Sequence, residues 1–151
     1  MKYAFMSFSC PEADLTGMLE LARKYGYDGI EPRTGGMHRH GVELDLGAEE
    51  RKRILEQARD RGVAVACIAV GSKFADPAVN AACRAEAEAG IRLAHDLDCR
   101  IVRVFGGLLP EGTDRDEAIT RVADSLKSLA PLANDLDVTV CLETHGAEIF
   151  R

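Results

Sequence analysis

The feature that most constrains the fold is an alternation of short apolar runs with longer amphipathic segments along the whole chain. Five apolar runs begin near residues 3, 28, 63, 99 and 137, and helical periodicity follows each of the first four. Strands that alternate with helices predict an α/β protein with a parallel sheet. The predicted order of elements is (βα)₄β.

The third apolar run indicates how the sheet is buried. Residues 63–70 are apolar at every position, which favours a parallel strand covered on both faces. The predicted strands are 3–8, 27–33, 63–70, 100–105 and 138–143. The predicted helices are 15–25, 48–61, a helix that starts at Asp76-Pro77, and one that opens at 113–117 and is kinked or ended by Pro131.

The spacing of the strands favours a barrel. Successive strands start roughly 25 to 38 residues apart, so eight such units would need the ~250 residues of a closed eight-stranded barrel. Five strands and four helices make a little more than half of one. An open, doubly wound sheet is the alternative, but no G-x-G-x-x-G motif follows the first strand.

Composition excludes several classes of function. The net charge is −6 and no basic cluster is present, which disfavours nucleic acid as a partner but leaves small anionic ligands possible. No apolar run reaches the ~18–20 residues of a membrane span, and residues 1–4 lead directly into a strand rather than a signal peptide. We therefore expect a cytoplasmic protein.

The five cysteines predict free thiols. Cys67, Cys99 and Cys141 lie in or beside strand-like runs, where buried thiols are more common than disulfides. No C-x-x-C pair is present, which disfavours a zinc cluster built from cysteines.

Polar side chains gather at or after the carboxyl ends of the predicted strands, where a parallel barrel carries its site. The candidates are Glu31, Arg33, His38, His40, Lys73, Arg103, Glu143 and His145. They suit an anionic or polyhydroxylated ligand, with a carboxylate available as a base or a metal ligand.

Glu143 is the strongest of these candidates, because a carboxylate that ends the apolar run 138–142 is costly to bury unless it is paired or binds a metal. The others have structural alternatives. Glu31 equally suits hydrogen bonds inside a barrel, His38 and His40 suit a solvated loop, and Lys73 suits the surface. Arg103 faces the barrel interior or the helices, depending on register.

Three segments together resemble the sugar phosphate isomerase/epimerase family, the xylose isomerase-like TIM barrels. They are Gly26-Tyr27-Asp28-Gly29-Ile30-Glu31, Val102-Arg103-Val104-Phe105-Gly106-Gly107 and Leu142-Glu143-Thr144-His145. The resemblance covers the whole chain but only about the first five strands of the family's fold. It implies a partial TIM (β/α)₈ barrel, with residues 1–151 as a single incomplete domain.

The resemblance also implies an activity, a cofactor and a set of roles. Members bind a divalent metal (Mn, Mg, Co or Zn) at the barrel mouth, and the epimerases among them move a proton between adjacent carbons of a ketose through an enediolate. Glu143 aligns with the first metal ligand and with one of the two catalytic glutamates. Sugars or polyols are the implied substrates, and Glu31, Arg33, His38, His40, Arg103 and His145 are the predicted substrate contacts.

The other three metal ligands of the family have no counterpart here, so we expect this chain to be a fragment of a longer enzyme, with weak or absent metal binding and no activity alone. One alternative is a non-catalytic half-barrel that associates with itself or a partner through open sheet edges. Another is a DNA repair enzyme similar to endonuclease IV, which the acidic charge disfavours. Isomerase, epimerase and dehydratase are not separated by the sequence.

Overall fold

The computed structural model describes residues 1–36 and 38–144, and over this range the chain folds into parallel strands backed by helices. The strands are β1 (Ala4–Met6), β2 (Gly29–Glu31), β3 (Ala64–Val65), β4 (Ile68–Ala69), β5 (Ile101–Phe105) and β6 (Thr139–Glu143). The helices are α1 (Leu15–Tyr25), α2 (Ala48–Asp60), α3 (Asn80–Asp96) and α4 (Arg115–Asp135), with a 3₁₀ turn η1 (Ser7–Ser9) after β1. This is the predicted α/β class and the arrangement of a partial TIM barrel.

The strands pair in chain order as two parallel groups, β1-β2-β3 and β4-β5-β6. Backbone hydrogen bonds join the groups, since the amide of Ala66 donates to the carbonyl of Ile30 and the amide of Ala69 donates to that of Pro32. Thr34 in turn donates its amide to the carbonyl of Ala69. The two groups are therefore parts of one curved, five-stranded surface.

The third strand corrects the sequence prediction. It was predicted as one uninterrupted strand over 63–70, but it bends at residues 66–67 into β3 and β4. β3 pairs with β2, whereas β4 pairs with β5. Because of the bend, one strand pairs with two neighbours that diverge as the sheet curves. A uniformly apolar run does not indicate such a bend.

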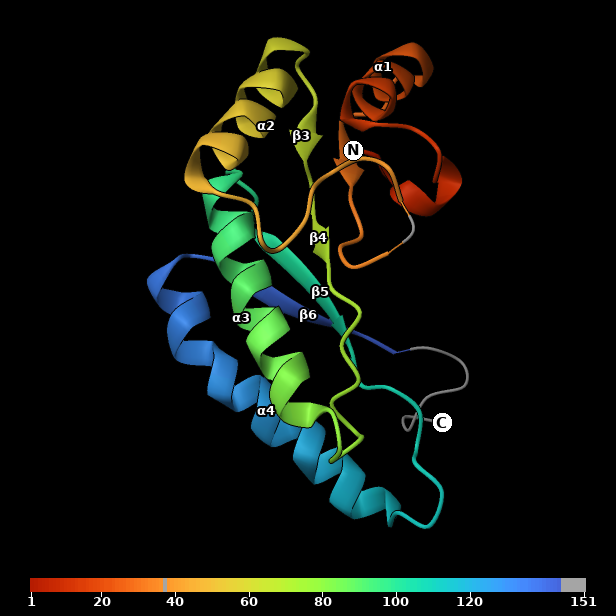
Figure 1. Cartoon of the computed structure of the whole chain (residues 1–151), viewed down its shortest axis with the longest axis vertical. Helices are drawn as coiled ribbons and strands as arrows, with labels where there is room; N and C mark the ends of the chain where they lie inside the picture. Colours follow the sequence, from red (N-terminus) through yellow and green to blue (C-terminus); the bar gives the residue numbers. More distant parts are fainter. Residues whose placement is uncertain (37, 145–151) are drawn as a thin grey trace.

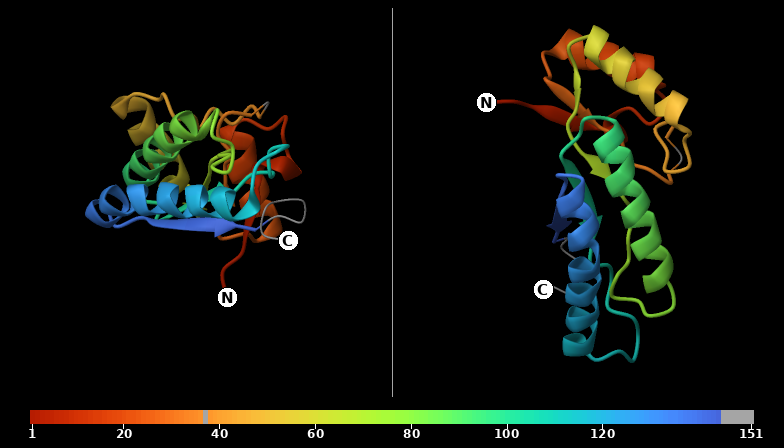
Figure 2. Two further views of the ribbon diagram at one scale, coloured as in Figure 1. Left: turned by 90° about the horizontal axis from the view of Figure 1, so that it is seen from below. Right: turned by 90° about the vertical axis from the view of Figure 1, so that its left-hand side faces the viewer.

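The helices lie on the outer face of this surface (Figures 1 and 2). α1 packs on β2, α2 on β3, α3 on β4 and β5, and α4 on β6. The core fills the space between helices and sheet. Its largest fully buried side chains include Met18, Leu19, Ile30, Phe74 and Ile91. Full burial of each such side chain stabilises the fold by roughly 1.5–3 kcal/mol.

Strand alternation decides which side chains reach the inner face. Val102 and Val104 are fully buried beneath the helices, so Ile101, Arg103 and Phe105 face the other way. In the parallel register Arg103 pairs with Cys141, and Phe105 with Glu143. The interior orientation of Arg103, which the sequence left open, is thereby fixed by register.

The local sequence pattern predicted the helices correctly except at two points, the start of α3 and the effect of Pro131 in α4. Asp114 caps α4 through its carboxylate, within the start that the sequence indicated, and Asp14 caps α1 in the same way. The predicted start at Asp76-Pro77 is wrong, because the Asp76 carboxylate accepts from the amide of Ala78 in a separate turn and α3 begins at Asn80. Pro131 lies inside α4 rather than ending it. It is exposed, so the carbonyl that loses its partner can bond to water.

The five cysteines are free, as predicted, but they differ in burial. Cys83 and Cys99 are buried, whereas Cys141 is exposed on β6, contrary to the expectation that it is a buried thiol. In the described part of the chain no helix has the length and apolar character to cross a bilayer.

Candidate functional site

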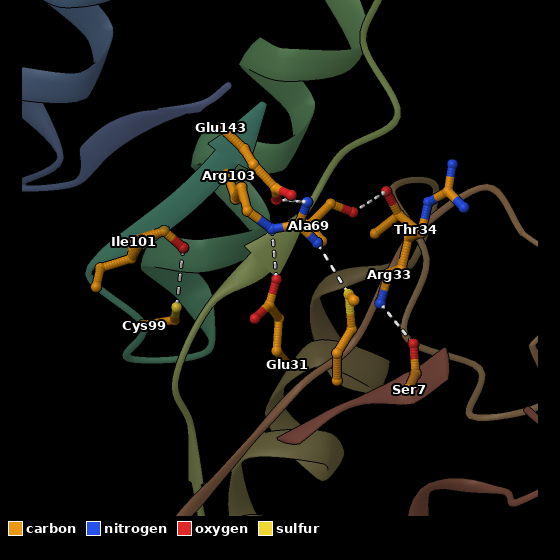
Figure 3. Close-up of polar contacts among 10 residues, drawn as sticks. Ser7, Glu31, Arg33, Thr34, Ala69, Cys99, Ile101, Arg103 and Glu143 are labelled. Atoms are coloured by element: carbon orange, nitrogen blue, oxygen red, sulfur yellow. Dashed lines mark hydrogen bonds and ion pairs between the residues drawn. The ribbon is translucent and has the colours of Figure 1, made fainter. Parts of the chain in front are cut away.

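The centre of the candidate site is Arg103, which lies between two glutamates (Figure 3). Its Nε donates to Glu31 Oε1 at 2.7 Å and its Nη1 donates to Glu143 Oε2 at 2.5 Å. Its third nitrogen, Nη2, lies 2.9 Å from Met6 Sδ. One guanidinium therefore contacts residues as many as 97 positions away from it in the sequence.

Three strands bring these groups together at their carboxyl ends. Glu31 is the last residue of β2 and Glu143 is the last residue of β6. Arg103 lies in the middle of β5, and its long side chain reaches the level of both carboxylates. The predicted convergence of these three residues on one mouth is therefore observed.

The triad is largely shielded from water. The side chain of Arg103 is 13% exposed, that of Glu31 23% and that of Glu143 37%. The ring of Phe105 lies 4.8 Å from the guanidinium carbon of Arg103 and contributes a cation–π contact. Charge-assisted hydrogen bonds in such surroundings hold both carboxylates in fixed positions.

Within residues 1–36 and 38–144, each carboxylate has one oxygen without a hydrogen-bond partner. Among the described residues, Glu143 Oε1 and Glu31 Oε2 have no hydrogen-bond partner, while the other oxygen of each is bound to Arg103. Nearby, burial and then the charge of Glu31 raise the pKa of the Cys67 thiol to about 12. Cys67 is therefore a neutral part of the site rather than a thiolate nucleophile.

Arg33 lies beyond the end of β2 and has a different environment from Arg103. Its backbone amide donates to Ser7 Oγ at 3.0 Å, and its side chain stacks on Phe8, with 5.0 Å from the guanidinium carbon to the ring centre. Its Nε is buried and has no partner among the described residues. The Arg33 guanidinium also forms no ion pair with an acidic side chain in this part of the chain.

The two loop histidines bind protein groups rather than standing free in solvent. His38 Nδ1 lies 2.6 Å from Ser7 Oγ, and its ring contacts Phe8 edge-on. His40 is 4% exposed; its Nδ1 accepts from the amide of Val42, so its Nε2 carries the proton and donates to the carbonyl of Arg33 at 3.1 Å. Burial lowers the pKa of His40.

The histidine contacts position the loop that holds Arg33. Substrate contact by His38 or His40 stays a prediction, and for His40 both ring nitrogens are engaged by the backbone. His145, the remaining predicted contact, lies outside the described residues.

A cavity next to the triad contains a residue that sequence reasoning assigned to the surface. It has a volume of about 470 Å³ and is lined by residues that include Arg33, Lys73, Asp76 and Phe105. Lys73 is exposed, as the sequence indicated, but its side chain borders this cavity. Its position four residues after β4 was the available signal, since the carboxyl ends of parallel strands share one mouth.

The comparisons identify the class of fold and then the family. The model of the family described as the xylose isomerase-like TIM barrel matches residues 19–150. The chain belongs to this family. No curated protein sequence matches the chain significantly.

Solved structures with the same fold include sugar epimerases. A D-psicose 3-epimerase studied with D-fructose has a TM-score of 0.74 at 23% identity, over 95% of this chain and 52% of its own. The 3-keto-D-glucoside 4-epimerase YcjR of E. coli has a TM-score of 0.79 at 14% identity, over 98% of this chain and 57% of its own.

A third structure, the IOLI protein with a bound zinc atom, has a TM-score of 0.78 at 21% identity and covers 99% of this chain and 54% of its own. At these identities the likeness shows the fold. The chain spans about half the length of the structures it matches.

The described residues do not by themselves form a metal site. Among them no group of three or more His, Cys, Asp or Glu side chains has a metal-binding arrangement. Glu143 offers a hard oxygen donor, but one of its oxygens is bound to Arg103 and its nearest acidic neighbour in the network, Glu31, is separated from it by that cation. Three or four protein ligands are usual for a catalytic metal, so this donor set is incomplete.

Proposed function

We propose that the protein is an isomerase or epimerase of a sugar, sugar phosphate or polyol, in which Glu143 moves a proton at a carbon next to a carbonyl. The observation that supports this proposal best is the geometry of Glu143. It ends β6 at the barrel mouth, one oxygen is anchored by Arg103, and the other is unengaged in the described structure. The family and its epimerase neighbours favour the same chemistry.

The proposed step is a general-base reaction. Glu143 Oε1 takes the proton from the carbon beside the carbonyl of the substrate, and the electron pair of the broken C–H bond forms an enediolate. A second acid on the opposite face of the substrate that protonates the same carbon gives an epimer. Protonation of the former carbonyl carbon, with the hydroxyl proton passing to the former carbonyl oxygen, gives an isomer. A well-placed base of this kind contributes about 10²–10⁴-fold to the rate.

Arg103 has a positioning role in this proposal. Because it holds one oxygen of Glu143, the carboxylate cannot rotate freely, and the reactive oxygen keeps its orientation toward the mouth. Glu31, bound to the same guanidinium, supplies a second acceptor for a hydroxyl group of the substrate. These two carboxylates also fit a polyhydroxylated ligand better than an apolar one.

We further propose that the complete enzyme uses a divalent metal, with Glu143 as one ligand. The zinc atom in the IOLI protein supports this for a fold neighbour. The present chain supplies one such donor, Glu143, and it spans about half the length of the matched structure. The metal and its remaining ligands are properties of the complete enzyme.

The experiment compares Glu143→Gln with a matched surface change, Glu56→Gln, in the protein encoded by the complete natural reading frame. Each protein is incubated with D-fructose and related ketoses in D₂O, and NMR follows deuterium entry beside the carbonyl and the appearance of epimer. We expect Glu143→Gln to lower both rates by about 10²–10⁴-fold, with Glu56→Gln at the wild-type rate. Full activity of Glu143→Gln would refute the proposal.

A second candidate is a non-catalytic half-barrel that associates through its sheet edges. Two observations favour it: β1 and β6 each pair on one side only in the described structure, and the inner face exposes Ile101 and Cys141. Unpaired edges are templates for strand addition. Sedimentation of the 151-residue chain tests this candidate: a discrete dimer supports it, and a monomer at micromolar concentration refutes it.

A further inference from the structure

The cavity beside the triad contains more cationic side chains than acidic partners for them. Arg33 and Lys73 both line it, and both also line an adjoining cavity of about 310 Å³. Asp76 is the acidic residue of the first cavity, and one of its oxygens is already bound to the amide of Ala78. Glu86 is the acidic residue of the adjoining cavity, so each cavity has two cationic side chains and one acidic one.

Neither cation is neutralised within the described structure. The buried Nε of Arg33 has no hydrogen-bond acceptor, and the ammonium of Lys73 has no ion-pair partner among these residues. Stacking on Phe8 fixes the plane of the Arg33 guanidinium while leaving its edge without a partner. A buried donor without an acceptor is unfavourable, so an acceptor from a ligand would relieve it.

Two glycines let the backbone pass close to the two cations of the cavity. Gly71 lies against Arg33, where a β-carbon would come within 3.3 Å of Nη2. Gly107 adopts φ +92°, and a β-carbon there would come within 3.0 Å of the α-carbon of Lys73. A residue with a side chain at either position would crowd one of the two cations.

Phe105 lies between the cavity and the proposed reaction centre. Phe105 lines the cavity, its ring contacts the Arg103 guanidinium, and it is the register partner of Glu143. The two cations and the two carboxylates therefore lie on either side of one aromatic side chain.

We propose that Arg33 and Lys73 form an anion subsite, which holds a phosphate or carboxylate group of the substrate while its reacting carbons lie beside Glu143. This inference rests on the proposed function for the reaction, but binding of the anion itself does not. Both anions offer two or more oxygens to a guanidinium edge and an ammonium, which is the chemistry that the cavity recognises.

The first measurement is a calorimetric titration of the 151-residue chain with inorganic phosphate. Arg33→Gln and Lys73→Gln are compared with Arg92→Gln and Lys127→Gln, which remove the same charges from the exposed faces of α3 and α4. We expect affinity about tenfold weaker in each of the first pair and unchanged in the second. Equal losses in all four variants, or none in the first pair, would overturn the subsite.

The second measurement identifies the anion. The chain is titrated with D-fructose, D-fructose 6-phosphate and D-gluconate. We expect at least one anionic compound to bind about tenfold more tightly than D-fructose, with the preference lost in Lys73→Gln. Tighter binding of D-fructose 6-phosphate assigns a phosphate, and tighter binding of D-gluconate assigns a carboxylate. Equal affinity for all three would contradict the proposal.

Two controls keep the conclusions separate. Lys73 is exposed, so Lys73→Gln tests the subsite even if Arg33→Gln disturbs folding, which circular dichroism would reveal. Glu143→Gln is expected to bind phosphate as the unaltered chain does. Lost phosphate binding in the cation variants together with an inactive complete enzyme would support the subsite and refute only the isomerase proposal.

Discussion

Two arginines at the same barrel mouth have opposite surroundings. Arg103 has a partner for each of its terminal groups: two glutamates, a methionine sulfur and an aromatic face. Arg33 has an aromatic face and, in the described structure, no acceptor for its buried Nε. The first arrangement is complete as a protein structure, whereas the second is complete only with a ligand. The comparison teaches that partners, rather than residue type, separate a positioning arginine from a binding one.

The largest expected effect is on stability, from Arg103→Met. Removing the cation leaves Glu31 and Glu143 close together and partly buried without a counter-charge. We expect a loss of about 2–4 kcal/mol in the free energy of unfolding, measured by urea denaturation. Arg33→Met is the matched control and should lose less than about 1 kcal/mol, chiefly its contact with Phe8. Equal losses in the two variants would remove the distinction between the arginines.

A carboxylate supplied to Arg33 should make it resemble Arg103. Gly71→Asp adds an acid whose β-carbon would lie 3.3 Å from Arg33 Nη2. We expect phosphate affinity to fall about tenfold, with stability changed by less than about 1 kcal/mol. Gly71→Asn adds the same bulk without the charge and should keep most of the affinity. If the two variants lose affinity equally, crowding rather than charge is the cause.

The smallest expected effect is a pH dependence from His40, which holds the carbonyl of Arg33. Burial lowers the pKa of His40 from its ordinary value near 6.5, so below that pH the unfolded chain binds a proton that the folded chain resists. The contribution of His40 to stability is therefore complete above pH 6.5 and is lost as the pH falls toward the lowered pKa.

Urea denaturation between pH 7.5 and 5 measures this contribution. We expect His40→Gln to flatten the fall in stability over this range, whereas His95→Gln, at an exposed position, should leave it unchanged. A profile that is the same with and without His40 would show that other groups cause the pH dependence.

Most of the fold followed from local patterns. Asp14 and Asp114 cap their helices because a short acidic side chain satisfies free amides there, and this depends on nearby sequence alone. The bend in the third strand did not follow, because it depends on the divergence of β2 and β5. β2 ends 33 residues before β3 begins, and β5 begins 32 residues after β4 ends. Asp76 was misread because a cap and an isolated turn use the same carboxylate-to-amide bond.

The candidate site was predictable in its members but not in its pairing. That Glu31, Arg103 and Glu143 converge follows from their places at or near strand ends. That one guanidinium binds both carboxylates depends on the register of β5 and β6, which the apolar pattern leaves open by one residue. Lys73 was left at the surface because its neighbours in space, Arg33 and Phe105, come from other units.

The ion pair between Arg103 and Glu31 has a mechanical consequence. It joins β5 to β2 across the bent third strand, so it braces the two sheet groups at the angle that the bend gives them. The ion pair at the site therefore also helps to set the curvature of the sheet. A substitution at Glu31 or Arg103 that changes the charge of the site would therefore also loosen the connection between the two strand groups.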